Sequence, residues 1–435
     1  MRLLTRTILA ILLPFAATAQ EPPADARRQE LRDLQARGDA DFFAGRYAEA
    51  LDRYREAEAL ATSLVEEAAL PALLANQGAL LAVLGRYEEA RDTLGRALAE
   101  SERFGDRWRV AYVLLNQGMI ESGSGRYGDA LRLLQRAADE WRTLGDAPSE
   151  GRARLTIGGV YSEIGLFAEA EAALERALAL FEGESSEPDR ARTLRTIGLA
   201  RLDAGRAGDA LDVLDRAIPM LRRAGDAWGA MSAVRFRGMA LLALERAGEA
   251  EAAFQGALGA AETVGDPFEA LLARTGLAEA LERQERRDEA EAAYREVLSR
   301  ADPLGTPEAS WRARLGLGRA IESRGDEARA IETYLAAIEE IEAIRSVLGS
   351  PALRGRYLGD KLELYRRAAR LLARAGREEE SFRLTEAAKA RTLLELGAVR
   401  PPDAPEPLPL PEEEARLVRS TEGRLVSLEL RAAGL

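Results

Sequence analysis

The sequence predicts an all-α protein built as a solenoid, a row of similar helix pairs that each contact their neighbours. Three observations lead to this fold class. Alanine recurs every 40 residues, glycine and large apolar residues recur in register with it, and the good helix formers Ala, Leu, Arg and Glu dominate a composition with only 6% aromatic residues. The alanines in register are Ala50, Ala90, Ala130, Ala170, Ala210, Ala250, Ala290 and Ala330.

Each 40-residue unit has further fixed points, which predict two antiparallel helices, A and B. A small residue precedes the alanine by 12 positions, a large apolar residue follows it by four, and in seven of the eight units a second alanine follows it by seven, as in Gly78, Ala90, Leu94 and Ala97. Small residues let two helix backbones approach where they cross, and the large residue fills the space beside them. The small residue on helix A is called the reference residue below: Gly38, Gly78, Gly118, Gly158, Gly198, Gly238, Ala278 and Gly318.

Turn residues mark the ends of both helices in most units. A glycine follows helix A in six of the eight units, where the backbone needs a left-handed residue. Acidic residues then recur in the first turn of helix B, where they complement the positive end of the helix dipole. Between units the pair Gly-Asp recurs, for example at Gly105-Asp106, so that glycine can end one helix and aspartate can cap the next.

This pattern resembles the tetratricopeptide repeat (TPR) family over roughly residues 28–345. The resemblance rests on the reference residue, the turn glycine, the alanine and the large residue agreeing in register across eight units. It implies a right-handed superhelix of about eight helix pairs over residues 20–345, with a further helix pair after them. The unit of 40 residues is longer than the usual TPR of about 34 residues. HEAT and armadillo repeats share that length, but the small-residue pattern disfavours them.

In TPR proteins helix A lines an inner groove, so the resemblance places candidate binding residues there. In some TPR proteins, asparagines two positions before the reference residue form a ladder that binds a peptide backbone. An amide side chain can do this because it both donates and accepts hydrogen bonds. Nearby arginines could pair with acidic groups of a partner, although both sets could also be ordinary structural residues. The candidate groove residues are Asn76, Asn116, Thr156, Thr196, Arg152, Arg192, Arg195 and Arg235. Units seven and eight are acidic in this region (Glu279, Glu282, Glu322), so the groove is expected to have two polar halves.

Composition excludes several classes of function. The chain has no Cys and no His, which removes thiolate nucleophiles, imidazole bases and the usual zinc ligands. The sequence therefore predicts a chain without enzymatic activity, cofactor or metal. A GxGxxG stretch at 123–128 follows no expected strand and falls on an A–B turn, so it is not a dinucleotide site. The net charge of −12 disfavours nucleic-acid binding.

The first residues differ from the repeats. Arg2 and Arg6 precede an apolar run over residues 7–16, and Ala17-Thr18-Ala19 fits a small-x-small cleavage site. Residues 1–19 are therefore expected to be a signal peptide cut after Ala19, with the protein periplasmic or secreted and without a stable membrane span after cleavage. The run is too short for an ordinary span, and an uncleaved anchor is the alternative.

The strict period ends near residue 345, and three further segments are expected. Residues 346–398 should hold an additional helix pair, with its turn at Gly376. Residues 399–411 contain six prolines and should form a stiff extended linker. Residues 412–435 should form a C-terminal helix.

A second resemblance covers about 60 residues of this region. Ile341 to Arg345, Arg356-Tyr357, Tyr365, Ser381-Phe382 and residues 386–394 resemble the segment that joins TPR arrays to a CHAT domain, a caspase-like domain of bacterial proteins. No catalytic residue of such a protease can be assigned, because this chain has no Cys or His.

The expected function is therefore a non-catalytic exported scaffold that binds a protein or peptide in its groove. The alternative is the sensing or substrate-recruiting arm of a CHAT-type protease whose catalytic domain is not in this sequence. A cell-envelope assembly or secretion factor is a third possibility.

Overall fold

The computed structural model describes residues 26–44, 46–181, 186–304, 307–346 and 361–386. These residues form antiparallel helix pairs, with no strand among them, so the predicted all-α solenoid is confirmed. The A helices are α2 (Ala26–Phe43), α4 (Leu70–Val83), α6 (Arg107–Gly123), α8 (Ala147–Glu163), α10 (Glu187–Asp203), α12 (Ala227–Ala243), α14 (Pro267–Arg283) and α16 (Pro307–Ser323). The B helices are α3 (Tyr47–Ser63), α5 (Tyr87–Arg103), α7 (Tyr127–Leu144), α9 (Phe167–Leu180), α11 (Ala207–Arg223), α13 (Ala247–Val264), α15 (Arg287–Leu304) and α17 (Glu327–Ser346).

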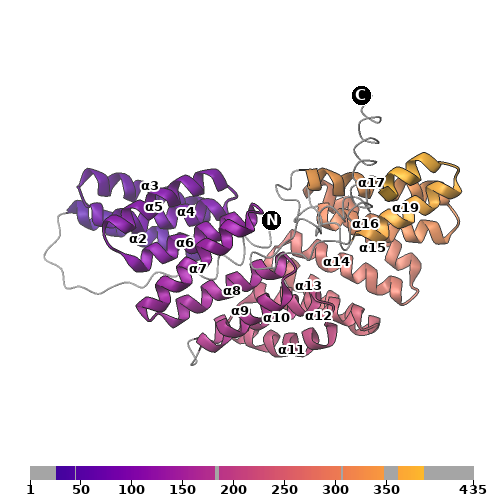
Figure 1. Ribbon diagram of the computed structural model, residues 1–435, viewed down its shortest axis with the longest axis horizontal. Helices are drawn as coiled ribbons and strands as arrows, with labels where there is room; N and C mark the ends of the chain where they lie inside the picture. The colour runs from indigo at the N-terminus through magenta and orange to yellow at the C-terminus, as the bar shows by residue number, and fades with distance from the viewer. Residues whose placement is uncertain (1–25, 45, 182–185, 305–306, 347–360, 387–435) are drawn as a thin grey trace, which may run out of the picture.

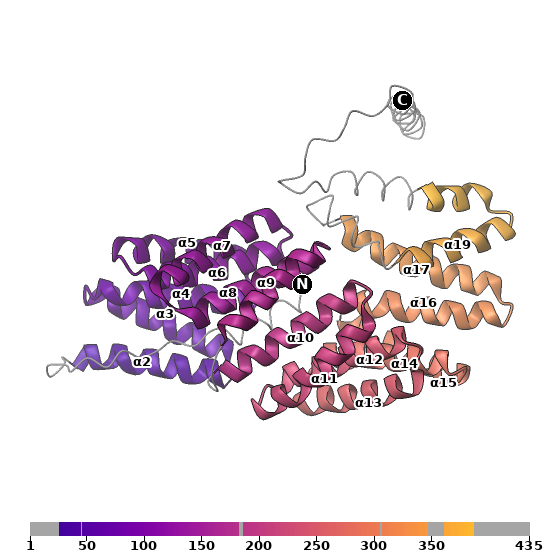
Figure 2. The same cartoon turned by 60° about the horizontal axis from the view of Figure 1, so that its bottom comes forward.

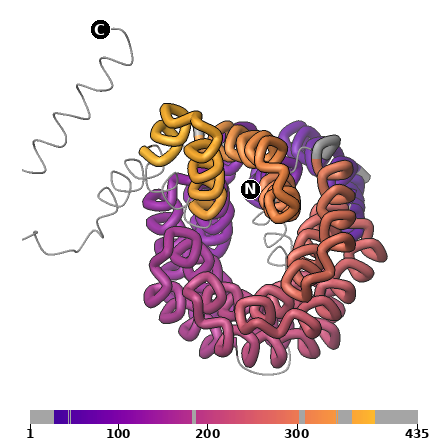
Figure 3. The backbone as a smooth tube through the Cα atoms, turned by 90° about the vertical axis from the view of Figure 1, so that its right-hand side faces the viewer, coloured from indigo at the N-terminus to yellow at the C-terminus, as the bar shows by residue number. Residues whose placement is uncertain are grey.

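The helix pairs follow one another along the molecule and wind around its long axis. Figures 1 and 2 show the units in chain order from α2 to α19, and Figure 3 shows the tube curling around a central space. Most successive A helices contact one another, whereas no pair of successive B helices makes comparable contact within the described residues. The A helices therefore form the inner layer of the superhelix and the B helices the outer layer.

The crossing of A and B has the geometry that the repeat predicts. The eight alanines in register are between 0% and 2% exposed. A Cβ atom added to Gly78 would lie 2.5 Å from Cγ of Leu94, and one added to Gly158 would lie 2.5 Å from Cγ of Leu174. Because real Cβ atoms do not approach so closely, glycine is needed in these units where the large residue of helix B presses on helix A. We call this large residue the knob of its unit.

The A–B turns keep one backbone conformation even where the glycine is replaced. Gly85, Gly125 and Gly165 have φ between 76° and 78°, as predicted for the residue that ends helix A. In units six and seven the same position is occupied by Glu245 and Glu285, with φ of 59° and 61°. These glutamates adopt a left-handed conformation that is costly for residues with a side chain.

The turns between units also follow the prediction. Gly105, Gly145, Gly225 and Gly265 have positive φ. The aspartate after each glycine accepts hydrogen bonds from backbone N–H groups in the first turn of the next A helix. These bonds are 3.0 Å to Asp106 and 2.8 Å to Asp226. Each aspartate is thus the N-cap of the next unit.

A ninth unit follows residues 347–360 and repeats the spacing within a unit, although it begins 11 residues later than the 40-residue period requires. Helix α19 (Leu362–Arg374) packs against α17, and residues 378–386 are helical after Gly376. Ser381 lies 12 positions after Ala369 and donates a 2.7 Å hydrogen bond to its carbonyl oxygen, so serine takes the place of the repeat alanine.

The other predicted segments lie outside the described residues. These are the signal peptide at 1–19, the Pro-rich linker at 399–411, the C-terminal helix at 412–435 and parts of the segment at 346–398. Within the described part of the chain, no helix has the length and apolar character that crossing a membrane requires.

Candidate peptide-binding surface

The inner surface is formed by one face of each A helix, opposite its own B helix. With 3.6 residues per turn, this face carries the positions six and two before the reference residue and one after it. In units two to eight, the residues at these positions are either buried or half-buried. The half-buried ones near the middle of the superhelix are Arg152, Thr156, Gly159, Arg192, Thr196, Leu199 and Met239.

The predicted asparagine and threonine positions lie on this face, but several of them bond to their own helix. Asn116 is only 2% exposed, and its Nδ2 donates a 2.9 Å hydrogen bond to the carbonyl oxygen of Tyr112. Thr156 and Thr196 each donate a 3.0 Å hydrogen bond to the carbonyl oxygen four residues earlier. Asn76 is half-buried beside Tyr54. Peptide binding by these residues stays a prediction, with Asn116 the least accessible of the four.

The same row of positions also faces the knob of the preceding unit. A Cβ atom added to Gly276 would lie 2.3 Å from Phe254, and one added to Gly316 would lie 2.1 Å from Tyr294. Where the knob is a leucine, the next unit carries Asn116, Thr156, Thr196 or Phe236 at this place. This row is therefore partly a packing position between units.

Three of the four predicted arginines form ion pairs that join successive A helices. Nε of Arg152 lies 3.0 Å from Asp189, and Nε of Arg192 lies 2.9 Å from Asp226. Arg235 reaches Glu269 with Nε at 2.8 Å from one carboxylate oxygen and Nη2 at 3.3 Å from the other. In each pair an arginine bonds to the start of the next A helix. We call these six residues the central ladder: Arg152, Asp189, Arg192, Asp226, Arg235 and Glu269.

Arg195 lies within this region but is not part of the ladder. It is 6% exposed, its Nη1 donates a 3.1 Å hydrogen bond to Ser232, and its guanidinium lies 5.0 Å from the ring centroid of Trp228. Burial lowers the pKa of Arg195 to about 10, so it stays a cation at neutral pH.

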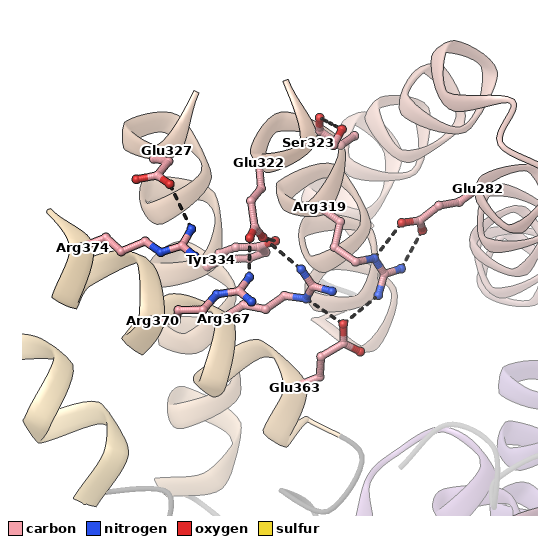
Figure 4. A network of polar contacts seen from close by, with 11 residues as sticks. Glu282, Arg319, Glu322, Ser323, Glu327, Tyr334, Glu363, Arg367, Arg370 and Arg374 are labelled. Atoms are coloured by element: carbon pink, nitrogen blue, oxygen red, sulfur yellow. Dashed lines mark hydrogen bonds and ion pairs between the residues drawn. The ribbon is translucent and has the colours of Figure 1, made fainter. Parts of the chain in front are cut away.

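Units seven to nine carry a second set of ion pairs. In this set a glutamate of one unit bonds to an arginine of the next unit, the reverse of the central ladder. Nε and Nη2 of Arg319, which form one edge of its guanidinium, donate hydrogen bonds of 2.8 and 2.6 Å to Glu282 of the preceding unit, and its Nη1 lies 3.6 Å from Glu363 (Figure 4). Glu322 pairs with Arg367, at 3.0 Å, and with Arg370 (Figure 4). We call these six residues the C-terminal network: Glu282, Arg319, Glu322, Glu363, Arg367 and Arg370.

Two tyrosine knobs support this network. Tyr294 and Tyr334 donate hydrogen bonds of 2.8 and 2.9 Å to Glu282 and Glu322. Burial alone would raise the pKa of Glu322, but the hydrogen bonds from Tyr334 and Arg367 outweigh it and hold that pKa below its ordinary value. The acidic half predicted from the sequence is thus largely neutralised by arginines, and Arg319, Arg367 and Arg370 were missed as its partners. These arginines lie 37, 45 and 48 positions after their glutamates, so no fixed spacing in the sequence indicates the pairs.

One further hollow lies at the A–B turn of unit three. It has a volume of about 400 Å³ and is lined by Arg91, Gln117, Glu121, Arg126, Asp129, Arg132 and Leu133. Its arginines already pair with acidic neighbours, as in the 3.0 Å contact between Arg91 and Glu121. Within the described residues no group of three or more Asp or Glu side chains could hold a metal ion.

Family models agree with the geometry of the repeat. Two models described as tetratricopeptide repeat match the chain, one over residues 69–139, 109–183 and 149–223 and the other over residues 269–343. The chain belongs to the tetratricopeptide repeat family. No curated protein matches the sequence.

Solved structures with low sequence identity share this fold. A Rap protein complexed with the competence and sporulation factor has a TM-score of 0.61 at 16% identity, covering 85% of this chain and 99% of the other. The apo quorum sensor NprR from B. thuringiensis has a TM-score of 0.60 at 12% identity, covering 73% and 89%. The Rap conjugation gene regulator of plasmid pLS20, in complex with the Phr* peptide, has a TM-score of 0.52 at 13% identity, covering 85% and 96%. At these identities the likeness concerns the fold alone.

Proposed function

We propose that this TPR protein is an exported, non-catalytic scaffold that binds a protein or an extended peptide along the inner surface of its superhelix. The observation that carries the proposal is Gly159 on α8. This glycine is half-buried on the inner face, and a Cβ atom added to it would meet nothing within 4 Å. Beside it, the inner face offers both polar side chains (Thr156, Thr196) and an apolar one (Leu199). An extended peptide needs this mixture for its backbone and side chains.

Two similar structures support the class of ligand. The Rap protein and the plasmid regulator named above were solved with a bound factor and a bound peptide. Because this chain shares their solenoid fold, we expect it to bind a peptide as well.

A pair of glycines provides a matched test. Gly159→Trp would fill the inner surface, whereas Gly259→Trp would place the same side chain on the exposed face of α13, where an added Cβ also meets nothing. Neither variant should lower the melting temperature appreciably. With p-benzoyl-phenylalanine in place of Leu199, irradiation in the source cells should cross-link a partner. We expect Gly159→Trp to abolish this cross-link and Gly259→Trp to leave it intact. Cross-linking that persists in Gly159→Trp would show that the inner surface is not the binding site.

One measurement tests both export and the alternative function. It is the intact mass of the protein recovered from its source. Loss of residues 1–19 from the 47.3 kDa chain, with the product in the periplasm or medium, would support an exported scaffold. An unshortened cytosolic product would contradict it. A mass larger by a whole domain would instead favour the recruiting arm of a CHAT-type protease. The ninth unit supports that alternative, because α19 and residues 378–386 fall within the segment that resembles the approach to such a domain.

A further inference from the structure

One end of the described array presents a surface that the next unit covers everywhere else in the array. Helix α19 and residues 378–386 form unit nine at this end, with Ala369 as its reference residue (Figures 1 and 2). In units one to eight, the residue directly after the repeat alanine is buried or half-buried. Leu211 and Ile331, for example, are 7% and 3% exposed. In unit nine this residue is Phe382, which is 61% exposed.

At several joints the next A helix covers this position with a residue of matching character. Nε of Arg91 lies 3.0 Å from Glu121 of the next unit. Ile331 lies in one hydrophobic cluster with Leu372 of the next unit. Both covering residues stand three positions after the reference residue of their own unit. An apolar residue at this position of a following A helix is therefore the natural partner of Phe382.

A second position on the same surface gives the same result. The residue three positions before the reference residue is at most 8% exposed in units two to eight. In unit six it is Arg235, which pairs with Glu269, nine positions before the reference residue of unit seven. In unit nine it is Arg366, which is exposed and forms no ion pair with the described residues. Unit nine thus presents an apolar ring and a cation that no described helix covers.

The sequence after unit nine contains a segment that fits both positions. Residues 412–435 repeat the spacing of an A helix when Gly423 is taken as the reference residue. Val426 then stands three positions after the reference residue, and Glu414 stands nine positions before it. Two further apolar residues, five before and two after the reference residue, agree with the leucine, valine and isoleucine of units two and three: Val418 and Leu425.

We propose that residues 412–435 dock on unit nine as a tenth A helix, with Val426 against Phe382 and Glu414 paired with Arg366. A single register places both residues opposite their partners. Burial of the phenylalanine ring stabilises the docked helix, and the pair between guanidinium and carboxylate fixes its register. This docking does not depend on peptide binding at the inner surface.

The connection to this segment is longer than the other connections between units. Three residues join α5 to α6, whereas residues 387–411 separate the segment from the described part of unit nine. An extended chain covers about 3.3 Å per residue, so this connection easily spans a helix of 17 residues, which is about 25 Å long. A tethered segment has a high effective concentration at its site, so a modest contact is sufficient to hold it. The tenth helix can therefore detach and rebind while the other units stay folded.

Engineered disulfides test the register in the full-length chain. The chain has no Cys, so an introduced pair reports one contact. Phe382→Cys with Val426→Cys should close an intramolecular disulfide about tenfold faster than Phe382→Cys with Arg424→Cys, because closure needs Cβ atoms about 4 Å apart. Arg424 has nearly the same tether but lies about 200° around the helix from Val426. Non-reducing electrophoresis and intact mass measure both rates.

Two results of the disulfide experiment would overturn the proposal. Equal closure rates in the two variants would mean that the segment has no fixed register on unit nine. Disulfides that link two chains would assign the surface to a second copy of the protein, and not to residues 412–435 of the same chain.

Hydrogen exchange tests the ion pair without cysteines. In the wild type, the amides of residues 416–431 should exchange about tenfold more slowly than in an unfolded chain. Arg366→Glu should remove most of this protection, and adding Glu414→Arg to the same chain should restore it. Arg190→Glu reverses an exposed arginine on α10 and should leave the protection unchanged. The proposal is overturned if the segment is unprotected in the wild type, if Arg366→Glu has no effect, or if Glu414→Arg does not restore the protection.

Discussion

The central ladder and the C-terminal network join successive A helices with the same residue types but in opposite order. In the ladder an arginine bonds forward to a carboxylate at the start of the next A helix, as Arg235 does to Glu269. In the network a glutamate near the end of an A helix bonds forward to an arginine, as Glu282 does to Arg319. The ladder pair is 7% and 2% exposed and the network pair is 23% and 27% exposed. We therefore expect burial, more than bond geometry, to decide how much each ion pair contributes to the free energy of unfolding.

The largest effect is expected from breaking a ladder pair. Arg235→Met leaves the carboxylate of Glu269 buried without its partner, and this should lower the free energy of unfolding by about 3–5 kcal/mol. Arg319→Met in the network should cost roughly 1 kcal/mol or less, because water can reach Glu282. Chemical denaturation of both variants measures the difference. Equal losses of unfolding free energy in the two variants would contradict the conclusion that burial separates the central ladder from the C-terminal network.

Packing at the joints should give the next largest effect. Gly276→Thr forces a side chain against Phe254, and we expect a loss of about 1–3 kcal/mol in the free energy of unfolding. In a Phe254→Leu background the same change should cost far less, since leucine followed by threonine is the natural combination of Leu134 and Thr156. A double-mutant cycle by chemical denaturation tests this coupling. Additive effects would mean that the two residues do not compete for one space.

Acid should weaken the C-terminal network. The pKa of Glu322 is held below its ordinary value in the folded protein, so this glutamate stabilises the fold at pH values above the unfolded pKa of about 4.3, and the contribution is lost as pH falls through the lower folded pKa. Glu322→Gln should therefore destabilise the protein on the order of 1 kcal/mol at pH 7 and much less at pH 3. Denaturation midpoints at the two pH values check this. A penalty that does not shrink in acid would exclude the ionised carboxylate as its cause.

The smallest expected effect concerns the A–B turns of units six and seven. Glu245→Gly and Glu285→Gly relieve a left-handed backbone and should each stabilise the protein by roughly 0.5–1 kcal/mol, after the greater flexibility of glycine in the unfolded chain is counted. The matched control is Glu175→Gly at an exposed position in the interior of α9, which should destabilise. Thermal melting distinguishes the two directions.

The repeat register could be predicted from the sequence because every unit has the same spacing of small and large residues. Gly78 with Leu94 and Gly158 with Leu174 pack as their spacing predicts. Pairing between units was harder to predict, since it depends on which faces of neighbouring helices meet. Arg235 and Glu269 are 34 positions apart, which is one unit less six, and this offset has meaning only once the contact between α12 and α14 is known.

The candidate site could be predicted only in part, for a related reason. Its position on the inner face of the A helices follows from the register. The availability of each side chain does not, because Asn116 bonds to its own helix and Arg192 and Arg235 bond to the next one. Among the predicted arginines, only Arg195 has no carboxylate partner within the described residues. Gly229 stands 34 positions after it, where Glu269 follows Arg235, but this difference has meaning only once the pairing of the A helices is known.

The match between each knob and the residue that follows it limits how the array can be shortened or extended. Removing a unit with a leucine knob, such as that of Leu174, would join Leu134 to Thr196 and recreate an existing kind of contact. Removing the unit of Phe254 would instead place Gly276 beside Leu214 and leave an empty space. The array is therefore modular among the units with leucine knobs and constrained at the unit of Phe254, where leucine knobs change to aromatic ones. Gene duplication or engineering can thus change its length at some joints and not at others.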